Sequence, residues 1–319
     1  MTIERRIGRS ELTAPPMMLG GNVFGWTADR DATFAILDAY VAGGARMIDT
    51  ADMYSSWIPG LKGGESETLI GEWIASRKGR DRLMIATKVG RAAGDLGGLS
   101  RHAIMAGIEG SLKRLQTDYV DLYFAHLDDR DTPLEETVEA FGDLVKAGKV
   151  RVLGASHYDA ARLEQAKAIT DGLGSARFDM LQPLYNLMSR PAFEGELQDY
   201  CIANDISVVP FWSLACGFLS GKYRSEADLA GRARAEEVRP YLTPFGLGVL
   251  DALDQVAAET ATSPSQVALA WLNSRASVLA PIASATNVAQ VEDLLGAMRL
   301  QLTPAQIALL DKASDQSAA

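Results

Sequence analysis

The chain has 319 residues, a length that fits either two average domains or one barrel-type domain. Its balance of 47% hydrophobic and 23% charged residues is that of an ordinary globular protein. The net charge of −10 argues against nucleic acids and anionic membrane surfaces as principal partners.

The cysteines and the amino-terminal segment indicate in which cellular compartment we expect the protein. Cys201 and Cys216 are too few for a disulfide framework and lack the spacing of a metal site, so we expect both to be reduced. Residues 1–9 contain no apolar signal region, and no later window is long enough to span a membrane. We therefore expect a cytoplasmic enzyme or binding protein.

Strand-like and helix-like segments alternate along the chain. Residues 3–16 predict a hairpin around a Gly-Arg-Ser turn, and a short apolar run at 17–19 precedes a helix over 31–42 that ends at two glycines. Further strand-like runs lie at 46–49, 83–87, 119–124, 150–154, 178–181 and 206–211, with a weaker one at 278–282. Further helix-like stretches lie near 65–76, 100–115, 134–146, 158–169, 191–203, 247–259 and 287–296.

This alternation predicts parallel strands joined by crossover helices, in either an open sheet or a closed barrel. No Gly-x-Gly-x-x-Gly follows the first strand, which weakens the dinucleotide-binding open sheet. About eight units in this length favour an α/β fold of the (β/α)8 TIM-barrel type, with an N-terminal β-hairpin and extra C-terminal helices. We expect one domain over 1–319, with 213–243 as a loop on the barrel.

The residues at the strand ends suggest a functional site. In chain order they are Asp49, Lys88, His126, Ser156, His157, Gln182 and Phe211. Function in barrels collects at the carboxyl ends of the strands, so these side chains should face one mouth. Each alone could be structural: a solvated lysine, a satisfied histidine or a turn cap. Their convergence at consecutive strand ends favours a site.

Four of these positions suit proton transfer. Asp49 can pair with Lys88, and the lysine ammonium should lower the pKa of nearby Tyr54 from about 10, making the phenol a general acid near neutral pH. His126 can hydrogen-bond a substrate oxygen. An activated Ser or Cys nucleophile and a metal-ligand cluster are both missing from the pattern, so a cofactor must supply the other half of the reaction.

Several motifs in order make the sequence resemble the aldo-keto reductases, in particular a bacterial branch similar to potassium-channel beta-subunit-like members. They are Arg-Arg-Ile-Gly-Arg-Ser (5–10), Met-Ile-Asp-Thr-Ala-Asp-Met-Tyr (47–54), Ala-Thr-Lys-Val-Gly (86–90), Phe-Ala-His-Leu-Asp-Asp (124–129), Gly-Lys-Val-Arg-Val-Leu-Gly-Ala-Ser (148–156) and Leu-Ala-Cys-Gly-Phe-Leu-Ser-Gly-Lys-Tyr (214–223). The resemblance implies the same barrel and a catalytic tetrad of Asp49, Tyr54, Lys88 and His126. It also implies that NAD(P)H delivers hydride to a carbonyl carbon and that Tyr54 protonates the oxygen.

The same resemblance implies a set of cofactor-binding residues. For the nicotinamide half and its surroundings they are Gly21, Asn22, Asp49, Ser156, His157, Gln182, Phe211, Trp212 and Ser213. For the pyrophosphate they are Leu214, Ala215, Gly217, Lys222, and Arg232 or Arg234; for the adenosine end they are Ser284, Thr286, Gln290 and Asp293.

Departures from the family pattern bear on cofactor choice. His157 stands where many members have Asn or Arg, and Leu294 replaces an Asn that often meets adenine. Ser284 and Gln290 occupy places where a Lys and an Arg can bind a 2′-phosphate. The resemblance still favours NADP(H), with NAD(H) as the alternative.

Aromatic residues in the mouth loops suggest the substrate pocket. Phe24, Trp26 and Trp57 would suit an apolar or cyclic carbonyl compound, although rim packing would explain them as well. The segment 55–64 is longer than in many members and could form a partial lid.

The main functional hypothesis is a carbonyl reductase that can run in reverse as an alcohol dehydrogenase. One rival is an NADP-binding regulatory subunit with slow turnover, as in potassium-channel assemblies; the intact tetrad favours catalysis instead. A second rival is a Schiff-base aldolase using Lys88, which would act without nicotinamide.

Overall fold

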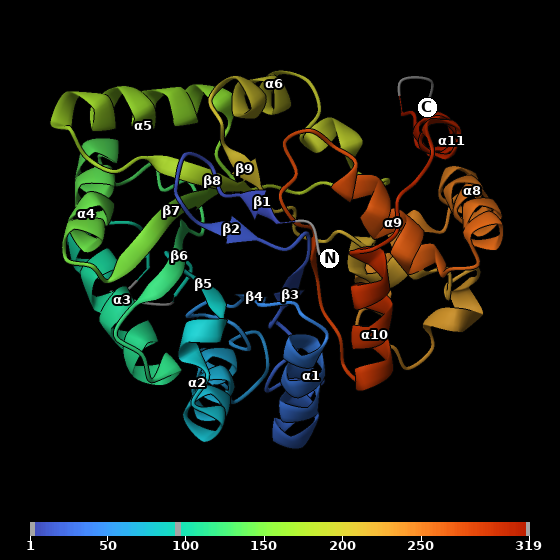
Figure 1. Cartoon of the computed structure of the whole chain (residues 1–319), viewed down its shortest axis with the longest axis horizontal. Helices are drawn as coiled ribbons and strands as arrows, with labels where there is room; N and C mark the ends of the chain where they lie inside the picture. The colour runs from blue at the N-terminus through green and yellow to red at the C-terminus, as the bar shows by residue number, and fades with distance from the viewer. Residues whose placement is uncertain (1–3, 93–96, 317–319) are drawn as a thin grey trace.

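The computed structural model describes residues 4–92 and 97–316, and its centre is an eight-stranded parallel sheet (Figure 1). The strands are β3 (Met18–Gly20), β4 (Met47–Asp49), β5 (Met84–Val89), β6 (Val120–Ala125), β7 (Val150–Ser156), β8 (Phe178–Gln182), β9 (Ser207–Val208) and β10 (Ile282–Ala283). Their order in the sheet is β10-β3-β4-β5-β6-β7-β8-β9. The Val208 N–H donates to the Ser277 carbonyl at 2.9 Å, and the Leu279 N–H donates to the Val208 carbonyl at 2.8 Å. These bonds join the two edges, so the predicted (β/α)8 barrel is confirmed.

Helices follow the strands and surround the sheet (Figure 1). Those near the predicted ranges are α1 (Arg30–Ala42), α2 (Glu65–Arg77), α3 (Arg101–Leu115), α4 (Leu134–Lys146), α5 (Ala160–Leu173), α6 (Glu196–Ala203), α8 (Pro244–Thr260) and α10 (Val288–Ala297). Two more, α9 (Pro264–Asn273) and α11 (Pro304–Ala313), are the extra C-terminal helices, whose ranges the sequence did not indicate. None of the helices within the described residues is long and apolar enough to cross a membrane.

The segment expected as a loop at 213–243 has local structure of its own. Its elements are the 3-10 helices η4 (Ala215–Ser220), η5 (Glu226–Leu229) and η6 (Arg239–Tyr241), and the short helix α7 (Ala235–Val238). The segment connects β9 to α8, so it starts at the carboxyl end of a barrel strand.

Helix starts are fixed by side-chain caps at the ends of the preceding loops. Asp29, Ser100 and Asp159 each accept a hydrogen bond from a backbone N–H in the first turn of α1, α3 and α5. Such caps satisfy N–H groups that have no partner within the helix. The loops that precede α1, α3 and α5 therefore each end at a defined residue.

Two apolar clusters form the core. The larger packs the helices against the outer face of the sheet. The smaller fills the barrel and includes Met18, Met47 and Met84 from the amino ends of three strands, together with Ile7 and Ala14 from the hairpin. That hairpin pairs β1 (Arg5–Arg6) with β2 (Thr13–Ala14), as predicted, and lies across the amino-terminal end of the barrel (Figure 1). Because the hairpin plugs this end, a ligand must enter from the carboxyl end.

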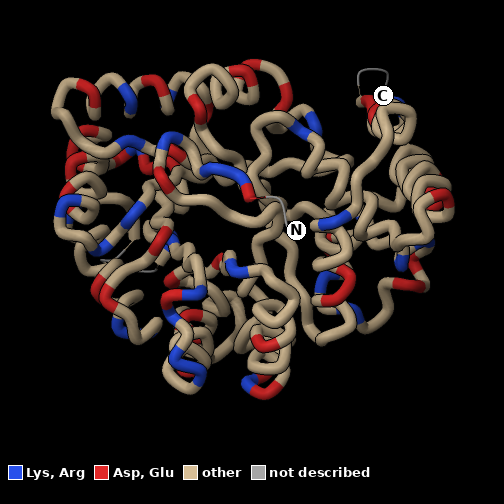
Figure 2. The backbone as a smooth tube through the Cα atoms, viewed as in Figure 1, with Lys and Arg blue, Asp and Glu red and all other residues tan. Residues whose placement is uncertain are grey.

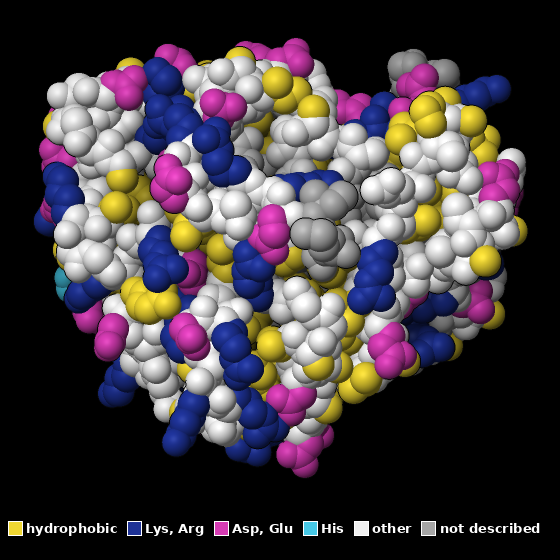
Figure 3. Space-filling view, viewed as in Figure 1, with side chains coloured by type: hydrophobic (Ala, Val, Ile, Leu, Met, Phe, Trp, Pro, Cys, Tyr) yellow, Lys and Arg dark blue, Asp and Glu magenta, His cyan; other side chains and the backbone are white. Residues whose placement is uncertain are grey.

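Charged residues lie mostly on the surrounding helices and loops (Figure 2). On the face that carries the hairpin, positive and negative side chains are interspersed with apolar ones, and no large area has a single sign (Figure 3). This face therefore offers no basic surface for a polyanion.

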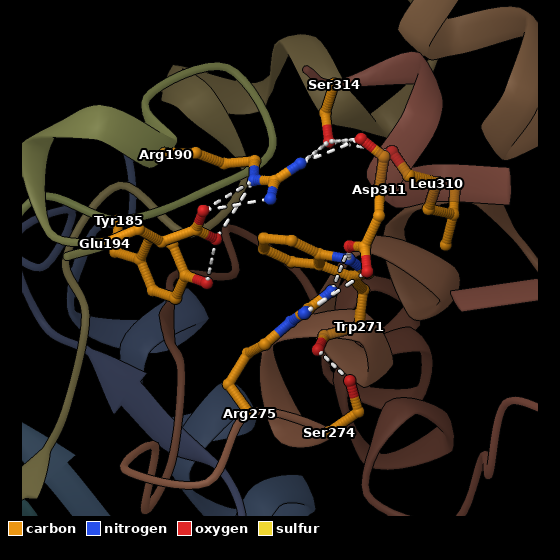
Figure 4. Close-up of polar contacts among 9 residues, drawn as sticks. All are labelled: Tyr185, Arg190, Glu194, Trp271, Ser274, Arg275, Leu310, Asp311 and Ser314. Carbon is orange, nitrogen blue, oxygen red and sulfur yellow. Dashed lines mark hydrogen bonds and ion pairs between the residues drawn. The ribbon is translucent and has the colours of Figure 1, made fainter. Parts of the chain in front are cut away.

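A polar network connects the C-terminal helix to the rest of the barrel (Figure 4). Arg190 donates to both carboxylate oxygens of Glu194 at 3.0 Å and to the backbone carbonyl of Asp311 at 2.8 Å. The Asp311 carboxylate accepts from the indole N–H of Trp271 at 2.8 Å and pairs with Arg275. Side chains from α9 and from the segment after β8 thus attach α11 to the molecule.

Candidate active site

Lys88 lies at the centre of the strand-end cluster and is fully buried. Its Nζ donates to the Asp49 carboxylate at 2.7 Å, to the Tyr54 hydroxyl at 2.6 Å and to the Thr50 carbonyl at 2.8 Å. Register explains the meeting, because Asp49 and Lys88 belong to adjacent parallel strands at their carboxyl ends. An ammonium has three donors, and all three are satisfied here.

Asp49 is buried and is satisfied on both carboxylate oxygens. Oδ2 accepts from Lys88 and, at 3.0 Å, from the Tyr54 hydroxyl; Oδ1 accepts from the side-chain amide of Gln182 at 2.9 Å. A buried ion pair is tolerated only where such additional hydrogen bonds complete it. The predicted pairing of Asp49 with Lys88 is therefore present, and Gln182 reaches it from across the barrel.

The pKa of Tyr54 does not move in the predicted direction. Burial, followed by the charge of Asp49 and the hydrogen bond to it, raises the pKa of the phenol well above its usual value of 10. Burial also lowers the pKa of Lys88, against the attraction of Asp49. The sequence argument considered the ammonium alone, whereas the tyrosine also donates to a carboxylate, which favours the protonated phenol. Tyr54 is consequently neutral at physiological pH.

His126 lies beside the tyrosine and is uncharged. Its ring centroid is 6.1 Å from that of Tyr54, with the planes at 69°. Burial, and then the charges of Lys88 and Arg91, lower the pKa of His126 well below 6.5. Its Nδ1 is buried and has no hydrogen-bond partner among the described residues. A neutral imidazole keeps one donor and one acceptor for a polar ligand.

A second cluster of buried polar residues lies next to Lys88 in the sequence, around the side chain of Thr87. Glu67 is fully buried and accepts from the Thr87 hydroxyl at 2.5 Å and from the guanidinium of Arg114 at 2.7 Å. Asp52 is close enough to Glu67 for repulsion to act, and one of its carboxyl oxygens has no partner in the described part of the chain. Sequence reasoning missed this group, although Asp52 lies only three residues after Asp49.

Two strand ends form a partly exposed surface next to the tetrad. Ser156 donates to the Gln182 carbonyl at 2.8 Å, which links the ends of β7 and β8. The rings of His157 and Phe211 are 5.4 Å apart, and Phe211 also contacts exposed Trp212 at 5.8 Å. A partly exposed aromatic face beside polar strand ends can receive a flat heteroaromatic ring.

The segment after β9 has a left-handed backbone. Ala215, Cys216 and Gly217 have φ of 47°, 58° and 98°, and the N–H groups of Ala215 and Gly217 donate to the carbonyls of Trp212 and Leu214 at 2.7 and 2.9 Å. A Cβ added at Gly217 would lie 3.6 Å from the Nζ of exposed Lys222. Lys222 has no carboxylate within ion-pair distance among the described residues. The ammonium of Lys222 is therefore available to a phosphate group of a ligand.

The C-terminal residues assigned to the adenosine end divide into two groups. Ser284 donates to the side chain of Asn22 at 2.6 Å, and Gln290 accepts from the Thr286 N–H at 2.8 Å. These side chains lie at or near the surface, where a ligand can reach them. Asp293 instead accepts from Ser263 at 2.6 Å and from Gln266, which joins α10 to the start of α9.

The aromatic residues of the mouth are only partly as expected. Trp26 and Trp57 contact each other edge to face at 5.8 Å, and Trp57 contacts Tyr54 at 5.9 Å. Phe24, however, is fully buried in the core between sheet and helices and lines no open pocket. Packing in the core accounts for Phe24, and its assignment to the substrate pocket stays a prediction.

Comparison with known proteins decides the family. Residues 16–315 match the model of the Aldo/keto reductase family. The chain belongs to that family. This aldo-keto reductase is 33% identical to the uncharacterized oxidoreductase YrpG of Bacillus subtilis, over 93% of this chain and 91% of the relative. It is 29% identical to norsolorinic acid reductase B of Aspergillus parasiticus (95% and 82%) and 28% identical to versiconal hemiacetal acetate reductase of the same species (96% and 95%).

Family membership makes this aldo-keto reductase an NAD(P)H-dependent oxidoreductase acting on small carbonyl compounds. Sequence reasoning did not find every residue at its mouth. Arg91, three residues after Lys88, donates through Nε to the His126 carbonyl at 3.0 Å. Arg234, assigned above to the cofactor, has its guanidinium carbon 5.6 Å from the ring centroid of Trp26. The position of Arg91 just past a strand end was a usable signal.

Proposed function

We propose that this chain reduces an aldehyde or ketone with NADPH, and catalyses the reverse oxidation, with Tyr54 as the proton donor. One observation supports this most strongly: the Tyr54 hydroxyl accepts from Lys88 at 2.6 Å and donates to Asp49 at 3.0 Å. A phenol held between an ammonium and a carboxylate is oriented and can exchange its proton with a bound oxygen.

The cofactor would lie along the barrel mouth from Phe211 to the C-terminal residues. Phe211, Ser156 and Gln182 would contact the nicotinamide, the backbone at Ala215 to Gly217 the pyrophosphate, and Ser284, Thr286 and Gln290 the adenosine end. When bound, NADPH supplies the hydride. We favour NADPH because the family resemblance does, and Lys222, exposed and without a carboxylate partner among the described residues, is the candidate contact for its 2′-phosphate.

The protein's own side chains position the carbonyl group and stabilise the negative charge that develops during the reaction. A carbonyl oxygen placed near Tyr54 and His126 would receive hydrogen bonds from the phenol and the imidazole. As negative charge grows on that oxygen, the phenol gives up its proton, and Lys88, already 2.6 Å away, stabilises the resulting tyrosinate. Asp49 keeps Lys88 in place and charged, and Gln182 keeps Asp49 in place.

The geometry disfavours the Schiff-base rival. A lysine nucleophile must be neutral and accessible, whereas Lys88 is fully buried and donates three hydrogen bonds. The complete tetrad likewise favours turnover over a purely regulatory role.

The test is a panel of aldehydes and ketones with NADPH or NADH, comparing wild type with Tyr54→Phe. Loss of the phenolic proton should lower kcat by roughly a hundredfold or more, the usual scale for a general acid. NADPH binding, followed by fluorescence, should be retained. Tyr200→Phe, which removes a hydroxyl on distant α6, is the matched control. Equal turnover by Tyr54→Phe and wild type would refute the mechanism.

A further inference from the structure

Two arginines at the mouth have no carboxylate partner among the described residues. They are Arg91, just after β5, and Arg234, in the segment between β9 and α8. Most other arginines here form ion pairs, such as Arg80 with Asp121 and Arg162 with Asp128. Arginines left unpaired beside a ligand site are available to an anionic group of the ligand.

Arg91 is fixed at one end and free at the other. Its Nε donates to the His126 carbonyl at 3.0 Å, so its position is tied to a tetrad residue. Its two terminal nitrogens form no hydrogen bond within the described ranges, and the side chain is exposed. Because the guanidinium is held through Nε, its two terminal NH2 groups point in a defined direction. Two parallel N–H donors suit a planar carboxylate.

Arg234 is far from Arg91 in the sequence, in the segment between β9 and α8, and it also lies at the mouth. Its guanidinium lies 5.6 Å from the centroid of Trp26, and edge-to-face contacts continue from Trp26 to Trp57 and from Trp57 to Tyr54. The aromatic side chains thus bridge Arg234 to the proton donor. The positive charges of Arg91 and Arg234 both lower the pKa of Tyr54, although burial and Asp49 raise it by more. Both guanidinium groups are therefore within electrostatic range of the phenol.

We propose that the substrate of this enzyme is an aldehyde or ketone that also carries a carboxylate, bound by Arg91 and Arg234. Trp26 and Trp57 would pack against its body. The inference rests on the proposed reductase function. The carboxylate is unchanged in the reaction: hydride from NADPH adds to the carbonyl carbon, the C=O π bond breaks, Tyr54 protonates the oxygen, and NADP+ and the hydroxy acid are released.

The cofactor phosphates do not require these arginines. Lys222 and Arg232 are both exposed on the segment that follows β9, and the left-handed backbone at 215–217 lies beside Lys222. Arg234 instead contacts a tryptophan from the loop after β3, and Arg91 contacts the backbone of His126. Their neighbours are substrate-side groups.

The experiment compares para-carboxybenzaldehyde with its neutral isostere para-formylbenzamide, with NADPH oxidation as readout. Wild type should favour the acid in kcat/KM. Arg91→Gln and Arg234→Gln should each lower kcat/KM for the acid about ten- to a hundredfold more than for the amide, the range for one charge-assisted contact. Raised salt should reduce the preference in wild type. Arg82→Gln, an exposed arginine before the same strand that Arg91 follows, is the matched control.

A binding measurement separates this inference from the proposed function. The product acid, para-(hydroxymethyl)benzoate, should change the tryptophan fluorescence of the NADP+-loaded protein and bind more weakly to both arginine variants. Equal use of acid and amide by wild type, or equal losses on both substrates in the variants, would overturn the inference. So would an effect of Arg234→Gln on the KM for NADPH alone. Failure of both aldehydes to be reduced, with product binding intact, would instead count against the reductase function.

Discussion

At the scale of single residues, the site depends on a lysine that cannot reach solvent. Lys88 keeps its charge because three acceptors replace its water shell, one of them the Asp49 carboxylate. The sequence predicts Asp49, Tyr54 and Lys88 because each lies at or just after a strand end. It could not predict the direction of the Tyr54 pKa, since that direction depends on which partner receives the phenolic hydrogen.

Asp52 is a second residue whose charge is set by its surroundings. Burial, and then the charge of Glu67, raise the pKa of Asp52 from 3.8 to about 7. Arg114, Lys88 and the backbone N–H of Met53 oppose this shift. The carboxyl is therefore protonated over a pH range in which the unfolded chain has already lost the proton.

The stability of the protein should thus depend on pH through Asp52. From about pH 4 to about pH 7 the folded state binds a proton that the unfolded state has released, so stability falls as pH rises through this window. Asp52→Asn should remove that slope and stabilise the protein at pH 8 by up to about 4 kcal/mol, the value of a shift of about three pKa units. Urea unfolding at several pH values checks this. Asp81→Asn, an exposed carboxyl, is the control; parallel pH curves for wild type and Asp52→Asn would contradict the argument.

At the scale of elements, the sequence indicated the ranges of the strands and of the amphipathic helices, but not the ranges of the two extra C-terminal helices. The strand-like run at 83–87 and the helix-like stretch at 134–146 are found as β5 and α4. Helix α9 is buried on nearly every side, so it lacks the polar face that reveals helical period. Helix α11 is short, although Thr303 and Gln306 form a capping box at its start, a signal that reading by hydrophobic period overlooks.

Asp311 tests how α11 is attached. Asp311→Ala removes the acceptor of Trp271 and the partner of Arg275, leaving two donors without their bonds (Figure 4). We expect a loss of about 1–3 kcal/mol in unfolding free energy, the cost of unsatisfied polar groups. Amide hydrogen exchange should become faster in α11. Lys312→Ala, on the same helix and exposed, should change neither quantity; equal exchange in Asp311→Ala and wild type would show that α11 is held by apolar contacts instead.

At the scale of the whole molecule, an acidic protein must bind an anionic cofactor. The net charge of −10 repels a dinucleotide phosphate at long range, so attraction has to come from a few unpaired cations near the mouth. The sequence predicted the barrel and the strand ends because these follow from periodicity. It could not show which side chains of the long segment between β9 and α8 lie at the mouth, because a segment without a regular period does not reveal which way its side chains point.

Lys222 is the cation on which cofactor preference should depend. It is exposed, lies beside Gly217 and has no carboxylate partner in the described part of the chain. If it contacts the 2′-phosphate, Lys222→Ala should weaken NADPH binding by about ten- to a hundredfold, the value of one charge-assisted contact, and NADH binding far less. Fluorescence titration with both cofactors at two salt concentrations measures this. Lys113→Ala, an exposed lysine on α3, controls for the change in net charge. Equal losses for NADPH and NADH would assign Lys222 to the pyrophosphate, which both cofactors share, and the preference for NADPH would then need a different cation.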